Sequence, residues 1–321
     1  MESTQSLKKR LKSVANISKI TKAMELVAAT KMRRAQEIAL ASRPYAFAAL
    51  DLLANLTLLE IERPELLKKR KVKNILYVLV ASDKGLAGAF NNSVFRKFEH
   101  YIQQEKHFNI SPNIKMFDFV AVGEKAFQYL SKKFSTMDQS MVLKKFTQAG
   151  DYTTPDQVEP LADFLIEGYL KKQYDKVIVF SSHFKSALKQ ESLTREILPV
   201  DFESIKNTIK EIIPETGKFS ELIKEQNISF VSEKKIKEYL IEPSPKIVLE
   251  NLTRHLVFMQ IYHIILEANA AEHSARRLAM KTASDNAADL SENLNLEYNK
   301  SRQAGITNQI IEIVAGSESL N

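Results

Sequence analysis

The segment of this 321-residue chain that most resembles a chemical site is SDKGLAGAFN, from Ser82 to Asn91. It follows a Leu- and Val-rich run and precedes a helical pattern, which is where α/β proteins usually bind phosphate groups. Gly85 and Gly88 form G-x-x-G, whereas a P-loop needs G-x-x-x-x-G-K-[ST] and a dinucleotide turn needs G-x-G-x-x-G. The spacing favours a tight structural turn, with a ligand site in a nucleotide-dependent α/β enzyme as the alternative.

The six histidines do not have the spacing of a metal site. They are His100, His107, His183, His255, His263 and His273. His255 and His263 are eight residues apart in a predicted helix, which separates them by two turns. Ser181 and Ser182 precede His183 without a nucleophile elbow. Because the chain also has no cysteine, we predict no catalytic residue, no metal site and no cofactor.

The basic charge of the chain is confined to its N-terminal segment. The net charge is +7, and residues 1–36 alone contain nine Lys or Arg against Glu2 and Glu25. This excess predicts an acidic partner surface, whether protein, nucleic acid or anionic lipid, unless it is only a solvated helix face. A basic-helix nucleic-acid-binding protein is therefore an alternative function. No helix-turn-helix, RRM or zinc-finger pattern accompanies the basic segment.

Two long helical patterns lie at the ends of the chain. Residues 7–59 contain no glycine and one proline, which predicts an N-terminal helix over 1–60. Its apolar stripe is predicted from Leu7, Leu11, Val14, Ile17, Ile20, Met24, Val27, Ala28 and Ala35. After Pro245 the chain has no proline, which predicts a C-terminal helix over 246–321 that could reach on the order of 100 Å. Coiled-coil-like spacing, with Leu290 among the seam residues, predicts that the two helices pair.

The middle of the chain, residues 73–242, alternates between strand-like and helix-like segments. Predicted buried parallel strands cover Asn74–Asp83, Ile114–Gly123 and Tyr174–Ser182, and REILPV is a further possible strand. Predicted helices run from Asn91 to about Lys106, from Glu124 to Phe134 and from Thr154 to Lys172. Residues 202–237 are expected to be an extension of this domain. The predicted fold class is α/β, with a long antiparallel coiled coil flanking a Rossmann-like domain.

Membrane association is expected to be peripheral. No run of about 18 apolar residues is present, so no transmembrane helix can be drawn. The N-terminal sequence MESTQSLKKRLKSV lacks the apolar stretch of a secretory signal. The expected location is the cytoplasmic side of a bacterial cell membrane.

Three blocks of sequence resemble the gamma subunits of F-type ATP synthases. LKKRLKSVANISKITKAMELVAATKMRRAQ, residues 7–36, is similar to the N-terminal signature of that family. SDKGLAGAFN resembles its central-domain turn, and residues 272–320 resemble its C-terminal signature. The resemblance covers nearly the whole chain.

The resemblance implies a central-stalk rotor subunit that is not an enzyme. The terminal helices are implied to turn as a shaft inside a ring of three alpha and three beta subunits. The α/β domain is implied to sit on the membrane-embedded c-ring beside epsilon. Such a subunit couples proton flow through the c-ring to ATP synthesis at the beta-subunit sites, and it regulates ATPase activity and proton flow.

The resemblance also implies which residues contact partners. Met24 matches a shaft residue that faces an acidic segment of beta. The positions implied in shaft-to-ring contacts and coupling are Glu272, Arg276, Arg302, Gln303 and Thr307. The apolar tip of the C-terminal helix, with Ile310 and Ile313, is implied to turn in the apolar sleeve of the ring.

Overall fold

The fold is described from a computed structural model. The described residues are 3–41, 49, 52, 56, 62–107, 116–134, 140–147, 153–201 and 241–318. The predicted extension at 202–237 and most of the predicted N-terminal helix beyond residue 41 lie outside them. The chain divides into two compact units. We call Met1–Ala28 with Arg276–Asn321 the two-helix unit, and Ala29–Ala275 the α/β unit.

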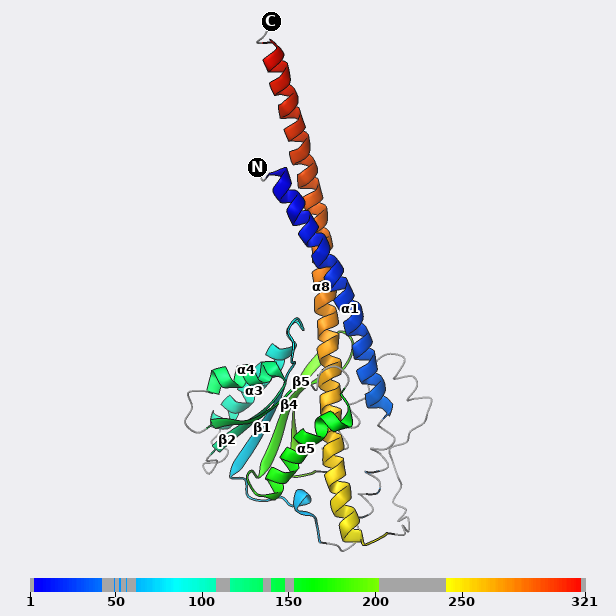
Figure 1. Cartoon of the computed structure of the whole chain (residues 1–321). Helices are drawn as coiled ribbons and strands as arrows, with labels where there is room; N and C mark the ends of the chain where they lie inside the picture. The colour runs from blue at the N-terminus through cyan, green and yellow to red at the C-terminus, as the bar shows by residue number, and fades with distance from the viewer. Residues whose placement is uncertain are drawn as a thin grey trace. The chain divides into compact units, whose positions relative to one another are not determined.

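Two long helices contribute to both units: α1, Thr4–Ala41, and α8, Pro245–Glu318 (Figure 1). Within the two-helix unit they are antiparallel. Lys22 lowers the pKa of Glu25 of α1, and Arg277 and Lys281 lower it by smaller amounts, so Glu25 lies near the start of this part of α8. Lys19, which precedes Glu25 in α1, lines a shallow groove with α8 residues that follow Lys281, such as Ser291. The two helices therefore run in opposite directions. The predicted antiparallel coiled coil is confirmed.

The seam of α1 differs from the predicted apolar stripe. Its buried and half-buried positions in the two-helix unit step by three and four residues: Leu7, Leu11, Val14, Ser18, Thr21, Glu25 and Ala28, with Met24 beside them. Ile17, Ile20 and Val27 were expected in the stripe, but their side chains are 49%, 59% and 54% exposed. A coiled-coil seam repeats every 3.5 residues whatever the residue types, so it passes through polar side chains here and leaves apolar ones outside. Leu290 of α8 is likewise outside the seam and exposed.

A five-stranded sheet forms the centre of the α/β unit. In chain order the strands are β1 (Asn74–Val80), β2 (Met116–Val122), β3 (Ser140–Phe146), β4 (Lys176–Phe184) and β5 (Gln190–Leu198). They lie in the order β3-β2-β1-β4-β5. The first four are parallel, and β5 pairs antiparallel with β4. The three predicted strands are confirmed as β1, β2 and β4, REILPV lies within and just after β5, and β3 was not predicted.

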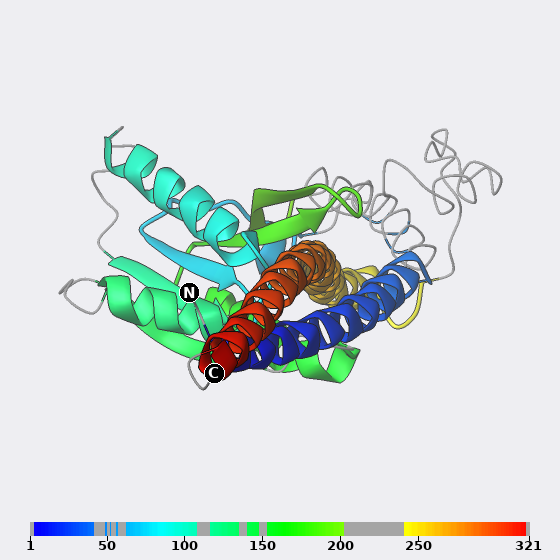
Figure 2. The same ribbon diagram turned by 90° about the horizontal axis from the view of Figure 1, so that it is seen from above.

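Helices cover both faces of the sheet (Figures 1 and 2). Helices α3 (Phe90–His107) and α4 (Glu124–Phe134) pack on the face that contains Tyr77, which contacts Phe98 of α3 edge to face. Helix α5 (Pro155–Leu170) and the first half of α8 pack on the other face, with Leu76 and Tyr169 in their core. A short 3-10 helix, Glu65–Leu67, packs at the edge of this core. Residues that alternate along β1 therefore enter two separate hydrophobic cores.

Gly123, between β2 and α4, occupies a position that only glycine fits. Its φ is +93°, and a Cβ there would lie 2.0 Å from the carbonyl oxygen of Ala81. We expect Gly123→Ala to lower the free energy of unfolding of the chain by roughly 2 kcal/mol or more, because backbone strain and the clash add. Urea unfolding followed by circular dichroism measures the change. The matched control is Gly85→Ala, whose Cβ would meet nothing within 4 Å; an equal loss in both variants would contradict the prediction.

Candidate coupling residues and the polar core of the C-terminal helix

The turn that most resembled a chemical site uses its polar groups internally. The Ser82 N–H donates to Asn91 Oδ1 at 3.0 Å, and Ser82 Oγ donates to the Lys84 carbonyl at 2.7 Å. Asp83 Oδ1 accepts from the Glu124 N–H at 2.9 Å, so this carboxylate caps the first turn of α4. These bonds fit the tight structural turn that the glycine spacing favoured.

The residues proposed to contact partners are divided between the two units. Met24 is half-buried in α1 of the two-helix unit. Glu272, in α8 of the α/β unit, is only 6% exposed, and Arg276, in the two-helix unit, is 9% exposed. Arg302 and Gln303 are exposed further along α8. Thr307 is exposed as well, and its hydroxyl donates to the Gln303 carbonyl at 3.0 Å, as threonines in helices commonly do.

The end of α8 presents apolar side chains to its surroundings. Leu294 is the last buried residue of α8, and every described side chain from Gly305 to Ala315 is exposed. Ile310 is 56% exposed and Ile313 is 70% exposed. Contiguous exposed apolar surface marks an interaction site in soluble proteins. The chain itself therefore leaves this helix end without an apolar cover in the described residues.

A buried ionic cluster joins α8 to the last two strands. Arg195 of β5 donates to Glu267 Oε2 at 2.9 Å and to Ser181 Oγ of β4 at 3.3 Å. His183 Nδ1 of β4 lies 3.3 Å from the same Glu267 oxygen. Burial opposes the charge on Glu267, but Arg195, His183 and His263 together hold its pKa below the ordinary value. The Glu267 carboxylate is thus an ionised group in the interior of the α/β unit.

Further polar contacts lie along the same part of α8. Tyr262 Oη donates to the Thr153 carbonyl at 3.1 Å, and Asn269 Nδ2 donates to Thr153 Oγ1 at 2.5 Å. Ser274 Oγ donates to the carbonyl of Ala187, in the β4–β5 connection, at 2.9 Å. It also accepts from Gln190 Nε2 of β5 at 3.1 Å. Thr153 directly precedes Thr154 and α5, so α8 is bonded to two different parts of the unit.

Histidine spacing did not reveal this cluster. His263 lies one helical turn before Glu267 on α8, but His183 comes from β4, and only the fold brings it to Glu267. A signal was present in the sequence, because residues 259–271 have apolar side chains at nearly consecutive positions, and so on every side of a helix, with several polar ones among them. A helix buried all round needs partners for each polar side chain. The polar residues of this stretch could therefore have been predicted to face the α/β domain.

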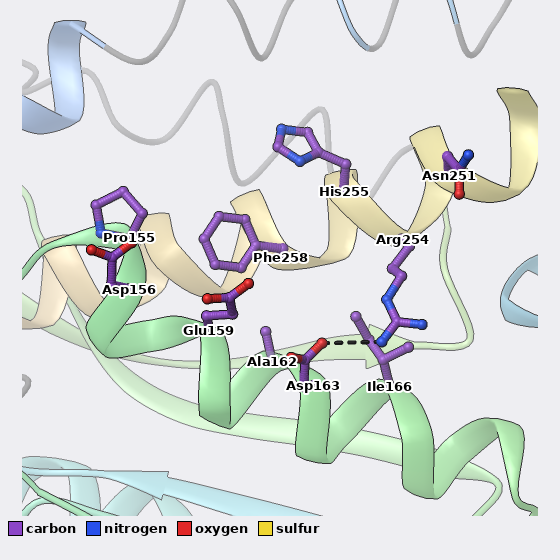
Figure 3. Close-up of a pocket in the computed structure, with 10 residues that line it drawn as sticks. All are labelled: Pro155, Asp156, Glu159, Ala162, Asp163, Ile166, Asn251, Arg254, His255 and Phe258. Atoms are coloured by element: carbon purple, nitrogen blue, oxygen red, sulfur yellow. Dashed lines mark hydrogen bonds and ion pairs between the residues drawn. The ribbon is translucent and has the colours of Figure 1, made fainter.

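A shallow groove of about 400 Å³ lies between α5 and α8 (Figure 3). Asp156, Glu159 and Asp163 line it from α5, and Arg254 and His255 line it from α8. Figure 3 shows Asp163 and Arg254 pointing toward one another, with Arg254 donating to Asp163 Oδ1 at 3.1 Å. Burial lowers the pKa of His255. The groove contains no nucleophile paired with a base among its described lining residues.

Neither a metal site nor a membrane span is found in the described part of the chain. No group of three or more His, Asp or Glu side chains there could hold a metal ion. None of the described helices combines the length and apolar character that crossing a membrane requires.

Comparison with known proteins places the chain in a family. The family model described as ATP synthase matches residues 3–320. The ATP synthase gamma chain of Roseiflexus castenholzii is 34% identical over 325 residues, covering 100% of this chain and 99% of the relative. That of Trichormus variabilis is 32% identical, with 100% of both chains covered. The chain belongs to the ATP synthase gamma-chain family. The gamma chain is the central-stalk subunit of F-type ATP synthase, a rotor subunit without a catalytic site.

The fold agrees with that of chains in solved ATP synthase structures. A chain in the rotor of Euglena gracilis mitochondrial ATP synthase has a TM-score of 0.58 at 17% identity, covering 94% of this chain and 98% of that one. A chain in the central stalk and c-ring structure from Tetrahymena thermophila has a TM-score of 0.53 at 22% identity, covering 83% and 99%. Because the chain belongs to this family, we set aside the two alternative functions, a nucleic-acid-binding protein and a nucleotide-dependent enzyme.

Proposed function

We propose that the chain transmits torque between a membrane c-ring and the catalytic beta subunits, and so couples proton flow to ATP synthesis. The two-helix unit is the shaft inside three alpha and three beta subunits, and the α/β unit binds the c-ring and epsilon. In this role the chain regulates both ATPase activity and proton flow. It is peripheral to the membrane, on the cytoplasmic side in a bacterium.

The observation that carries this proposal is the surface of the two-helix unit. Most of the large apolar side chains that are exposed among the described residues belong to this unit. Ile20 and Leu26 of α1 and Leu296 of α8 are each more than half exposed, and the end of α8 continues the pattern. An apolar outer surface is costly in water. It is suited to a sleeve that surrounds the helices and contacts them without directional bonds.

The basic residues of α1 are available on the same outer surface. Lys8, Lys12 and Lys19 are exposed, as the acidic-partner prediction requires. Charge complementarity with an acidic ring interior steers assembly and disfavours wrong partners. Met24, Glu272, Arg276, Arg302, Gln303 and Thr307 remain our proposed contact and coupling residues. We also propose the functional division into shaft helices over 1–60 and 246–321 and a c-ring-facing domain over 73–242.

Purification of the tagged chain from its own cells tests the proposal. We expect alpha, beta, epsilon and c subunits to be recovered with it. Recovery of none of them, from detergent extracts that preserve the intact enzyme, would refute the proposed role.

The isolated chain is expected neither to hydrolyse ATP nor to bind it tightly. It lacks a P-loop, and in the turn Ser82 and Asn91 bond to each other while Asp83 caps α4. Turnover assays and calorimetric titration of purified chain with Mg-ATP measure both properties. Sustained hydrolysis after complete removal of beta subunit would contradict the prediction, and chain mixed with purified beta serves as the positive control.

A further inference from the structure

The polar side chains of the buried part of α8 lie on two opposite sides of the helix. At about 100° per residue, Glu267 and Ser274 are seven residues and thus only about 20° apart. Tyr262 and Asn269 are also seven residues apart and share a side in the same way. Asn269 lies about 200° around the helix from Glu267. Each pair therefore occupies the side facing away from the other.

The two sides are bonded to different elements of the α/β unit. Glu267 and Ser274 bind β4, β5 and their connection through Arg195, His183 and the Ala187 carbonyl. The other pair, Tyr262 and Asn269, binds Thr153 ahead of α5. All four α8 side chains are buried or nearly so, which keeps water from competing for these bonds. The helix is thus held from two sides over the thirteen residues from Tyr262 to Ser274.

Apolar packing alone does not determine the rotational position of such a helix strongly. The remaining neighbours on α8, such as Ile264, Ile265 and Ala268, make non-directional contacts that change little when a helix turns slightly. Buried hydrogen bonds and ion pairs are directional, and polar groups left without partners are costly. They can therefore specify register where apolar residues cannot.

We propose that Glu267, Ser274, Tyr262 and Asn269 form a polar clamp that fixes α8 against rotation about its own axis in the α/β unit. The clamp makes the α/β unit and this part of α8 turn together, so torque is not lost through rotation of the helix relative to the unit. This inference rests on the proposed function in torque transmission. Glu267 is its main positioning residue, because Arg195 and His183 both converge on one of its oxygens.

The test uses Glu267→Gln in the assembled enzyme, in inverted membrane vesicles. Glutamine keeps the shape of the side chain but removes the charge that binds Arg195. We expect ATP hydrolysis to be retained and ATP-driven proton pumping to fall, with the loss increasing against an imposed opposing gradient. Glu250→Gln, the same change at an exposed position of α8, is the matched control and should pump normally. Normal pumping by Glu267→Gln under load would overturn the clamp.

A covalent replacement separates a mechanical role from general destabilisation. Gln190 Nε2 and Ser274 Oγ are 3.1 Å apart and the chain has no other cysteine, so Gln190→Cys with Ser274→Cys can be joined as a disulfide by a mild oxidant. Added to Glu267→Gln, the crosslink restores the grip without restoring the ion pair, and we expect pumping to recover. Failure to recover, with crosslinking complete on gels, would show that Glu267 does not act through the position of α8.

A milder variant serves if Glu267→Gln does not assemble. Ser274→Ala removes two hydrogen bonds from the same side of α8 without leaving a charge unpaired. Loss of pumping under load with hydrolysis retained supports the clamp, and unchanged pumping overturns it. The proposed function itself is judged separately, because it fails only if the parent chain does not recover alpha, beta and c subunits on purification.

Discussion

Replacing Met24 with lysine is expected to lower ATP-driven proton pumping by roughly fivefold while ATP hydrolysis stays within about twofold of the parent enzyme. We propose that Met24 faces an acidic segment of beta, so the new ammonium group forms an ion pair only at some rotary angles. An added pair worth about 1 kcal/mol changes the barrier between rotary states by roughly fivefold. Pumping by inverted vesicles and hydrolysis by the same vesicles measure the two activities.

The structure indicates that the chain itself tolerates this change. Met24 is half-buried beside the seam of α1, and lysine can place its alkyl stem there while the ammonium group reaches water. Met24→Leu, which keeps an apolar side chain, and Ala23→Lys, which adds a cation at the exposed neighbouring position, are the controls. Equal loss of pumping and hydrolysis in a fully assembled enzyme would mean that Met24 has a packing role only.

Changing both Ile310 and Ile313 to serine is expected to weaken retention of the chain in the complex by on the order of 100-fold or more. Burying an isoleucine side chain contributes about 1.5–3 kcal/mol, and two such losses exceed the roughly 2.8 kcal/mol that a 100-fold change in affinity requires. Both side chains are more than half exposed in this chain, so a partner is needed to bury them. Native gels and quantitative recovery of the chain with alpha and beta subunits measure retention.

The α/β domain, from Lys73 to about Pro199, should remain folded in the double serine variant, as limited proteolysis would show. The matched control is Asn308→Ser with Gln309→Ser, which alters exposed polar residues on the same helical turn. Normal assembly and coupled ATP synthesis with both isoleucines replaced would assign the apolar tip to internal packing instead.

The sequence predicted elements well where local signals agreed. Helix α4 matches its predicted bounds, and Thr154 followed by Pro155 marked the start of α5. Strand β3 was missed because an edge strand with Lys144 and Lys145 lacks a continuous apolar run. The failures thus lie where tertiary contacts decide the structure.

The seam and the polar core could not be read from residue types alone. Ser18 and Glu25 lie on the seam of α1 while Ile17 lies outside it, so a search for apolar periodicity selects the wrong face. Arg195 and Glu267 are 72 residues apart, and nothing local connects them. The proposed contact residues were taken from family resemblance, because the exposed surface of a single chain does not show which partner covers each residue.

The exposed isoleucines of the two-helix unit also affect the stability and solubility of the chain before it joins the complex. A free copy exposes Ile20, Ile310 and Ile313 to water, and such surface favours self-association. Binding to the folded form stabilises it in proportion to the logarithm of partner concentration, so the abundance of intact chain depends on how much ring is available. Synthesis in excess of alpha and beta subunits would therefore be self-limiting, since unassembled copies are left to chaperones and proteases.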